Sequence, residues 1–263
     1  MRLATWNVNS LKARMPKVEQ WLHDAQPDIL CMQETKVADA AFPTMAFRAL
    51  GYESAHHGNG RWNGVAILSR VGLEDPRPGF VGEEPAGIEE CRLLTADCGG
   101  VRVTSVYVPN GREVGSEFYA AKLEWLERLR RDLAESSSPD QAMAVCGDFN
   151  VAPEDRDVWD MRKVHGATHV SPEERAALGR IEELGLFDAF REVYPDTGKL
   201  FSWWDYRAGD FHQGRGMRID LVLVSEPLRK RIAYALIDRE ARKGMGSDKP
   251  PSDHAPVFVD FSD

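Results

Sequence analysis

The sequence has no run of apolar residues long enough to cross a bilayer, so a protein with membrane-spanning helices is not expected. Its start, from Met1 to Asn7, has the pattern of a strand and lacks the regions of a signal peptide. Cysteine is scarce, and no two of the four residues form a C-x-x-C pair: Cys31, Cys91, Cys98 and Cys146. We therefore expect a cytoplasmic protein without a membrane partner, whose thiols are free and buried.

Internal repeats, low-complexity tracts and linkers are also absent. A length of 263 residues is long for one domain but within the range of layered α/β folds. The hydrophobic pattern alternates between the period of strands and the period of helices, with hairpins as well as crossovers. These features predict a single domain, residues 1–263, with sheets inside and helices outside, and we expect a monomer.

An excess of positive charge is missing as well. The formal net charge of −9 argues weakly against broad, non-specific binding to nucleic acid. It does not exclude a nucleic-acid substrate, because a metal site needs clustered carboxylates. Bound metal ions and a local basic rim can reverse the sign of the charge where the substrate docks.

The stretch 142–151 carries the most informative local signal. An apolar run ends at Gly147, and Asp148 and Asn150 follow it, separated by one residue. The run fits a strand buried on both faces, and positions two apart on a strand share a face. A carboxylate and an amide are costly to bury without a role. Because Gly, Asp and Asn are also common in turns, this stretch alone leaves a polar turn and an active site equally open.

Other predicted strands end in polar side chains too. The strand 2–8 ends with Asn7, the strand 29–32 leads into Glu34, and the strand 101–108 ends with Tyr107. Carboxylate oxygen suits a hard cation such as Mg²⁺. A surface glutamate at the end of a strand is nevertheless the commoner case.

Asp220 lies inside the apolar run 217–224, where a carboxylate needs a partner. His254 is a candidate for that partner, and an Asp–His pair would hold the imidazole in place. Taken alone, Asp253 and His254 fit either a solvated turn or a site that binds metal and phosphate. Trp203 fits either the core or a surface that stacks on a sugar or base.

The remaining pattern gives a coarse set of elements. A helix is predicted to begin near Leu11 with Ser10 as its N-cap. Ser171, followed by Pro and by Glu three residues on, predicts the start of another helix. We also expect a short helix over residues 186–193 and an irregular loop over 71–88.

Seven short motifs occur in order along the chain: W-N-V-N (6–9), M-Q-E-T-K (32–36), W-N-G-V-A-I (62–67), Y-V-P-N-G (107–111), G-D-F-N (147–150), G-M-R-I-D (216–220) and S-D-H-A-P (252–256). Together they resemble the exonuclease III family of DNA-repair nucleases, of the endonuclease/exonuclease/phosphatase superfamily. The resemblance covers nearly the whole chain. It implies a four-layered α/β sandwich, with two mixed β-sheets packed face to face and helices outside. It also implies hydrolysis of DNA phosphodiesters with a divalent metal, usually Mg²⁺, with Mn²⁺ as an alternative.

The resemblance also implies a role for each matched position. The metal site would comprise Glu34, Asn7 and Asp253. The catalytic group, which would align the attacking water and contact the scissile phosphate, would comprise Asp148, Asn150, Tyr107, His254 and Asp220. The DNA-binding positions would be Asn110, Arg112, Lys122, Arg92, Arg207 and His169, of which Lys122 and Arg92 match less distinctive positions.

An apolar pocket for a flipped abasic sugar or a 3′ end is implied at Trp203, Met217 and Ile219. One position departs from the pattern, because His169 stands where abasic endonucleases of the family often carry a small residue. It resembles the branch that prefers 3′ ends and would obstruct an internal flipped sugar. The alternative is a surface histidine that contacts a backbone phosphate.

We therefore expect 3′→5′ exonuclease and 3′-phosphatase or phosphodiesterase activity on double-stranded DNA with 3′ ends, nicks or abasic sites. Incision at internal abasic sites depends on what His169 does. Two alternatives are a phosphatase of the same superfamily with a non-DNA substrate and a non-catalytic DNA-binding module. The aromatic segment 201–207 counts against the first alternative. The second is disfavoured because the chain keeps every polar residue that catalysis would need: Glu34, Asp148, Asn150, Asp220, Asp253 and His254.

Overall fold

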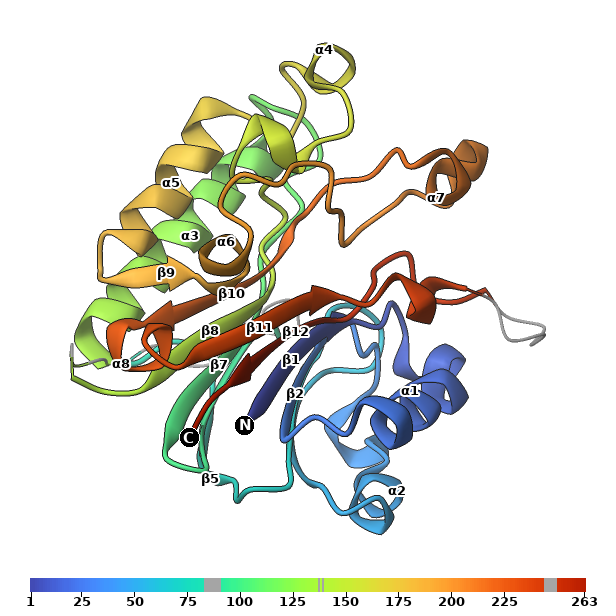
Figure 1. Ribbon diagram of the computed structural model, residues 1–263, viewed down its shortest axis with the longest axis vertical. Helices are drawn as coiled ribbons and strands as arrows, with labels where there is room; N and C mark the ends of the chain where they lie inside the picture. The colour runs from blue at the N-terminus through green and yellow to red at the C-terminus, as the bar shows by residue number, and fades with distance from the viewer. Residues whose placement is uncertain (83–90, 137, 139, 244–249) are drawn as a thin grey trace.

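A computed structural model describes residues 1–82, 91–136, 138, 140–243 and 250–263. Two six-stranded sheets lie face to face, and helices cover their outer faces (Figure 1). Each sheet contains one parallel pair among antiparallel neighbours, β1 with β2 and β7 with β8. The predicted four-layered α/β sandwich with two mixed sheets is therefore confirmed. No helix in the described part of the chain is both long and apolar enough to span a membrane.

The first sheet has the order β11-β12-β1-β2-β4-β3. It joins both ends of the chain, because β1 pairs antiparallel with β12. Its strands are β1 (Arg2–Asn7), β2 (Ile29–Gln33), β3 (Glu53–His57), β4 (Val65–Ser69), β11 (Ile232–Ile237) and β12 (Val257–Phe261).

The second sheet has the order β5-β6-β7-β8-β10-β9. Its strands are β5 (Glu74–Pro78), β6 (Leu93–Cys98), β7 (Val101–Tyr107), β8 (Met143–Asp148), β9 (Leu186–Asp188) and β10 (Asp220–Ser225). The prediction of an irregular loop over residues 71–88 is wrong at 74–78, where β5 forms. Residues 83–88 of that predicted loop lie outside the described part of the chain. β5 escaped prediction because it is an exposed edge strand with two prolines and no alternating pattern.

Helices α1 (Leu11–Ala25) and α2 (Thr44–Ala49) lie on the first sheet, and α3 (Glu117–Ser136) and α5 (Pro172–Glu182) lie on the second (Figure 1). The strands between these layers are apolar on both faces because each face is covered. The central core between the sheets contains Cys31 and Cys146, whose sulfurs lie 3.6 Å apart. All four thiols are free and buried, as predicted.

Ser171 caps α5 with the predicted capping box. The prediction that Ser10 caps α1 is wrong: its φ is +86°, its side chain makes no capping bond, and its backbone N–H donates to the carbonyl of Glu34 instead. The single helix expected over 186–193 is also wrong, because Leu186–Asp188 pairs with β10 before a helix begins. The shorter helices are α4 (Met161–Val164), α6 (Ala189–Val193), α7 (Asp210–Gln213), α8 (Glu226–Arg229) and 3₁₀ turns at Asp39–Ala41, Asp155–Asp157, Arg207–Gly209 and Arg239–Arg242.

Candidate active site

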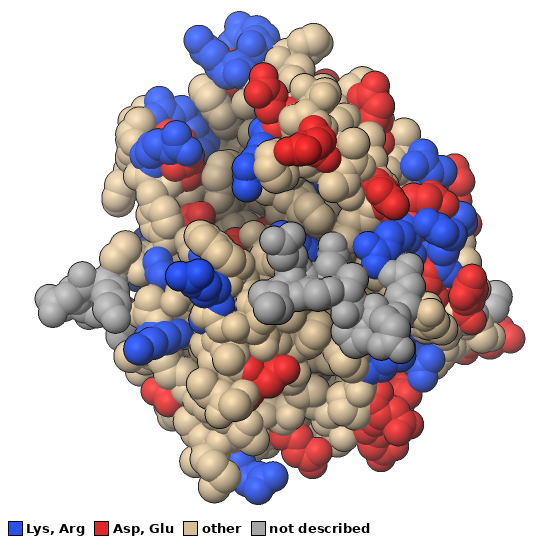
Figure 2. Space-filling view, turned by 180° about the vertical axis from the view of Figure 1, so that it is seen from behind, with Lys and Arg blue, Asp and Glu red and all other residues tan. Residues whose placement is uncertain are grey.

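Polar side chains gather at one end of the sandwich, where strands of both sheets finish. Asp148 is the last residue of β8, and it pairs in register with Tyr107 on β7 and with Asp220 on β10. Asn7 is the last residue of β1, which lies in the opposite sheet. Figure 2 shows a hollow on this face, with acidic side chains at its floor and Lys and Arg side chains around it. The common end of the two sheets thus brings together residues that are far apart in the sequence.

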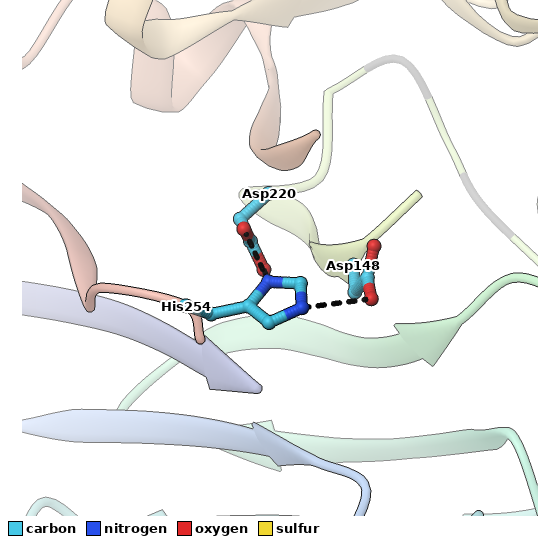
Figure 3. A group of neighbouring side chains, drawn as sticks. All are labelled: Asp148, Asp220 and His254. Carbon is cyan, nitrogen blue, oxygen red and sulfur yellow. Dashed lines mark hydrogen bonds and ion pairs between the residues drawn. The ribbon is translucent and has the colours of Figure 1, made fainter. Parts of the chain in front are cut away.

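His254 lies between two carboxylates that come from different strands (Figure 3). Its Nδ1 lies 2.9 Å from an oxygen of Asp220, and its Nε2 lies 3.8 Å from an oxygen of Asp148. All three residues are buried. The predicted pairing of Asp220 with His254 is confirmed, and it leaves Nε2 directed towards Asp148.

Burial and charge set the protonation of this group. Burial disfavours the imidazolium, but the negative charges of Asp220 and Asp148 outweigh it and raise the pKa of His254 to about 10. Burial, together with the charges of Asp220 and Glu34, raises the pKa of Asp148 to about 7 although His254 opposes the shift. At neutral pH the site therefore holds a charged histidine beside a carboxylate that exchanges its proton readily.

Asp148 is held by amides on both of its oxygens. One oxygen accepts from the backbone N–H of Asn150 at 2.9 Å, and the other accepts from Nδ2 of Asn7 at 2.9 Å. Nδ2 of Asn7 also donates to Glu34 at 2.9 Å, so one amide connects the two carboxylates. The orientation of Asp148 is thereby fixed from both sheets.

Glu34 lies on a tight turn after β2, with φ of +50°. Burial disfavours its charge, but Lys36, which lies 2.8 Å away, and Asn7 outweigh burial and lower the pKa of Glu34. Burial raises the pKa of Tyr107, and the charges of Glu34 and Asp148 raise it further. The Tyr107 hydroxyl therefore stays protonated and can donate a hydrogen bond.

Asp253 lies beside this group rather than in its centre. Nδ2 of Asn9 donates to one of its oxygens at 2.9 Å, and Nε1 of Trp203 approaches the other at 3.2 Å. Oδ1 of Asn9 in turn accepts from Lys36 at 2.7 Å. Asn9 thus connects Asp253 to the turn that carries Glu34.

The donor set suits a hard divalent cation. Four carboxylates, from Glu34, Asp148, Asp220 and Asp253, face one lysine and one charged histidine, so the cluster carries excess negative charge when ionised. Asp148, Asp220 and His254 could themselves surround an ion. However, Nδ1 of His254 and Oγ of Ser202 already donate to Asp220, and Mg²⁺ prefers oxygen ligands. Glu34 adds a further carboxylate beside this group, where Asn7 and Lys36 hold it.

The predicted DNA-binding residues do not form one surface. Asn110, Arg112 and Arg207 are exposed. Arg92 is half-buried, with its guanidinium 4.6 Å from the ring centre of Tyr107 and a hydrogen bond to the Tyr107 carbonyl. Lys122 contradicts the prediction: its side chain is completely buried against Glu174, so it does not reach a DNA backbone.

His169 is also buried, which makes its interpretation as a surface histidine wrong. Its Nδ1 lies 2.5 Å from the carbonyl of Asn150, and its Nε2 lies 3.4 Å from the amide of Asn110. Burial and the charge of Lys122 lower the pKa of His169 to about 4, so the ring is neutral at neutral pH.

The ring of Trp203 lies between His169 and His254, with its centre 6.5 Å from each ring. Met217 and Ile219 pack in the same apolar cluster as Trp203. The three residues predicted to form a pocket are therefore neighbours, with His169 beside them.

Three residues of the site escaped prediction. Ser202 is buried, donates to Asp220 at 2.7 Å and accepts the backbone N–H of Asp220. Asn9 and Lys36 connect Glu34 to Asp253. Asn9 and Lys36 belong to the motifs at 6–9 and 32–36, so their positions could have been found by the same argument. Ser202 carries no signal beyond its polar neighbours.

The sequence model of the endonuclease/exonuclease/phosphatase family matches residues 4–254. Exodeoxyribonuclease III of Haemophilus influenzae is 34% identical, with 99% of this chain and all of that protein covered. The structure of an AP endonuclease from Archaeoglobus fulgidus is 38% identical, with a TM-score of 0.92 and 99% of each chain covered. A 3′-phosphatase from Neisseria, bound to a product DNA hairpin, is 35% identical with a TM-score of 0.93 and covers all of this chain and 99% of its own.

Fold, site and relatives define a phosphodiester hydrolase. The chain belongs to the endonuclease/exonuclease/phosphatase family and, within it, to the exonuclease III-like DNA-repair nucleases.

Proposed function

We propose that this nuclease uses Mg²⁺, with Mn²⁺ as a substitute, to hydrolyse double-stranded DNA at 3′ ends and nicks. The observation that carries the proposal is the fixed carboxylate of Asp148, which faces the charged His254 between the two sheets. A phosphodiester is an anion, so its cleavage requires positive charge at the phosphate and an aligned water. The site offers groups for both tasks.

Each side chain then has a role that follows from its bonds. Asp148, oriented by Asn7 and by the backbone of Asn150, would accept a proton from the attacking water. His254, held by Asp220, would donate a hydrogen bond from Nε2 to a phosphate oxygen. Tyr107, protonated, would donate a second one.

Glu34, Asn7 and Asp253 would hold the metal ion, which would supply positive charge to neutralise the phosphate. Lys36 and Asn7 keep the Glu34 carboxylate charged although burial opposes that charge, and burial limits the side-chain freedom that Glu34 would lose on binding the metal.

The exposed Asn110, Arg112 and Arg207 would lie along the DNA backbone on either side of this site. The free thiols favour a reducing compartment, so we propose a cytoplasmic enzyme. We also propose that it acts as a monomer.

A direct assay uses end-labelled duplexes that carry either a 3′-phosphate or an internal abasic analogue, with Mg²⁺, with Mn²⁺ or with EDTA. We expect cleavage with the metals and none with EDTA. Asp148→Asn should lower turnover by about 10³-fold or more while the protein still folds and binds DNA. Cleavage of neither duplex would end the proposal, and near-normal turnover by the variant would show that Asp148 is wrongly assigned.

We further propose that His169 shifts the enzyme towards 3′-end processing. Its ring is buried beside Trp203, one of the residues predicted to hold an extruded sugar, and its backbone has φ of +77°. His169→Gly removes the ring and also suits that backbone conformation. We expect internal abasic incision to rise relative to 3′-phosphate release, whereas an unchanged ratio of the two rates would contradict this role.

A further inference from the structure

Helices α3 and α5 are connected by an ion pair that solvent does not reach. Nζ of Lys122 and a carboxylate oxygen of Glu174 are in direct contact, and both side chains have an exposed fraction of 0%. The stem of Lys122 packs under Gly111, where even a Cβ atom would come within 2.9 Å of it. The pair is therefore dry and closely packed.

The lysine end of the pair supports the loops that carry Asn110 and Asn150. Nζ donates to the carbonyl of Asn150 at 2.6 Å and approaches the carbonyl of Asn110 at 3.4 Å. Asn150 follows β8, and its backbone N–H holds Asp148. A displacement of Lys122 would thus be transmitted to Asp148 through a single residue.

The glutamate end supports the loop that carries His169. One oxygen of Glu174 accepts the backbone N–H of His169 at 3.0 Å and the hydroxyl of Thr168 at 2.8 Å. The other oxygen accepts from Ser171. The two supported loops are also bonded to each other, because Nδ1 of His169 donates to the same Asn150 carbonyl that Lys122 binds.

Both supported residues have a strained backbone. Asn150 has φ of +50° and His169 has φ of +77°, a region that residues other than glycine rarely adopt. Such conformations persist only where the surroundings impose them. The Lys122–Glu174 pair provides a hydrogen bond to the main chain of each residue.

Stability alone does not account for this arrangement. Charges are costly to bury, and well-packed apolar residues often replace a buried ion pair without loss of stability. What an apolar pair cannot provide is a donor for Asn150 and an acceptor for His169.

We propose that Lys122 and Glu174 are positioning residues that set the places of Asn150 and His169 together, and so couple the rate of cleavage to the choice of substrate. The proposal rests on the nuclease function proposed above. Lys122 would then act by holding the main chain of Asn150 rather than by contacting DNA.

The test compares Lys122→Met, Glu174→Gln and the double variant K122M/E174Q. The glutamine of E174Q retains an amide oxygen for His169, the methionine of K122M fills the space of the lysine stem, and the double variant leaves no unpaired charge.

We expect K122M to be less stable than the wild type and K122M/E174Q to recover most of that loss. K122M and K122M/E174Q should both have kcat lowered ~10- to 100-fold with a smaller change in KM, because the catalytic groups are displaced but still present. We also expect both to change the ratio of 3′-phosphate release to internal abasic incision.

The control is the pair of Arg77 with Asp132, an ion pair that also involves α3 but joins it to the edge strand β5, away from the site. Asp132→Asn should lower stability and leave both kcat and the activity ratio within about twofold of the wild type. If K122M/E174Q recovers kcat and the ratio together with stability, or if Asp132→Asn changes both as much, the pair is merely structural. If the wild type cleaves neither duplex, the nuclease proposal fails first, which distinguishes the two failures.

Discussion

At the residue scale, the charge of each site group follows from which neighbours offset its burial. Lys36 and Asn7 outweigh the burial of Glu34 and keep it ionised, whereas burial, with the charges of Asp220 and Glu34, raises the pKa of Asp148 to about 7. His254 is charged because the two carboxylates that flank it outweigh its burial, whereas burial, together with the charge of Lys122, keeps His169 neutral. Of the two buried histidines in one site, His254 therefore carries a charge at neutral pH and His169 does not.

This difference predicts the pH dependence of cleavage. Protonation of Asp148 removes the base, so the rate should fall as pH drops through the pKa of that residue, at about 7 in the protein alone. A bound cation lowers that pKa, so with saturating Mg²⁺ the acid limb should lie at or below this value. His254 should not limit the rate on the alkaline side until its pKa at about 10. A kcat profile from pH 5 to 9 with saturating Mg²⁺ and substrate tests this, and a rate that rises towards pH 5 would contradict it.

At the element scale, the site depends on the close pairing of β7 with β8. Gly147 lies opposite Val106 in this parallel pair, and a Cβ atom at Gly147 would come within 1.9 Å of the Val106 carbonyl oxygen. The glycine lets the strands approach, and Asp148 follows it directly. The change from apolar strand to Gly147 is therefore a packing requirement as well as the start of the site.

Gly147→Ala should lower the free energy of unfolding by about 1–3 kcal/mol or more, because the strands must separate or the backbone must shift. The shift would also displace Asp148, so we expect kcat to fall. Gly179→Ala, in α5, is the control, because its Cβ would meet no atom within 4 Å. It should be neutral or slightly stabilising in urea unfolding. Equal unfolding midpoints for the two variants would contradict the packing argument.

The strand ends could be predicted from sequence because apolar runs stop at polar side chains that share one edge of a sheet. Asn7 and Asp148 were found in this way, Asp220 was found as a carboxylate inside an apolar run, and the structure brings the three together. Lys122 could not be placed by its type, because lysine is ordinarily exposed. Its position does carry a signal, since it has helical spacing to Leu126, Leu129 and Leu133 on the buried face of α3.

At the scale of the whole molecule, the site exists only where the two sheets meet. Asn7 comes from the first sheet and Asp148 from the second, and a hydrogen bond of 2.9 Å joins them. The central core likewise draws on both ends of the chain, with Leu3 and Phe261 beside Val103 and Val222. Neither sheet could therefore form a complete site or a covered inner face without the other.

This shared core predicts that residues 1–263 unfold as one cooperative unit, although chains of this length often unfold in steps. Trp21 lies in the outer core of the first sheet and Trp125 in that of the second. Fluorescence of Trp21→Phe and Trp125→Phe, each of which removes one reporter, should give urea midpoints that agree with circular dichroism of the same variant. Separate midpoints for the two signals within either variant would mean that the sheets unfold independently. In that case the bond between Asn7 and Asp148 would break when the less stable sheet unfolds, and activity would disappear at the lower of the two midpoints.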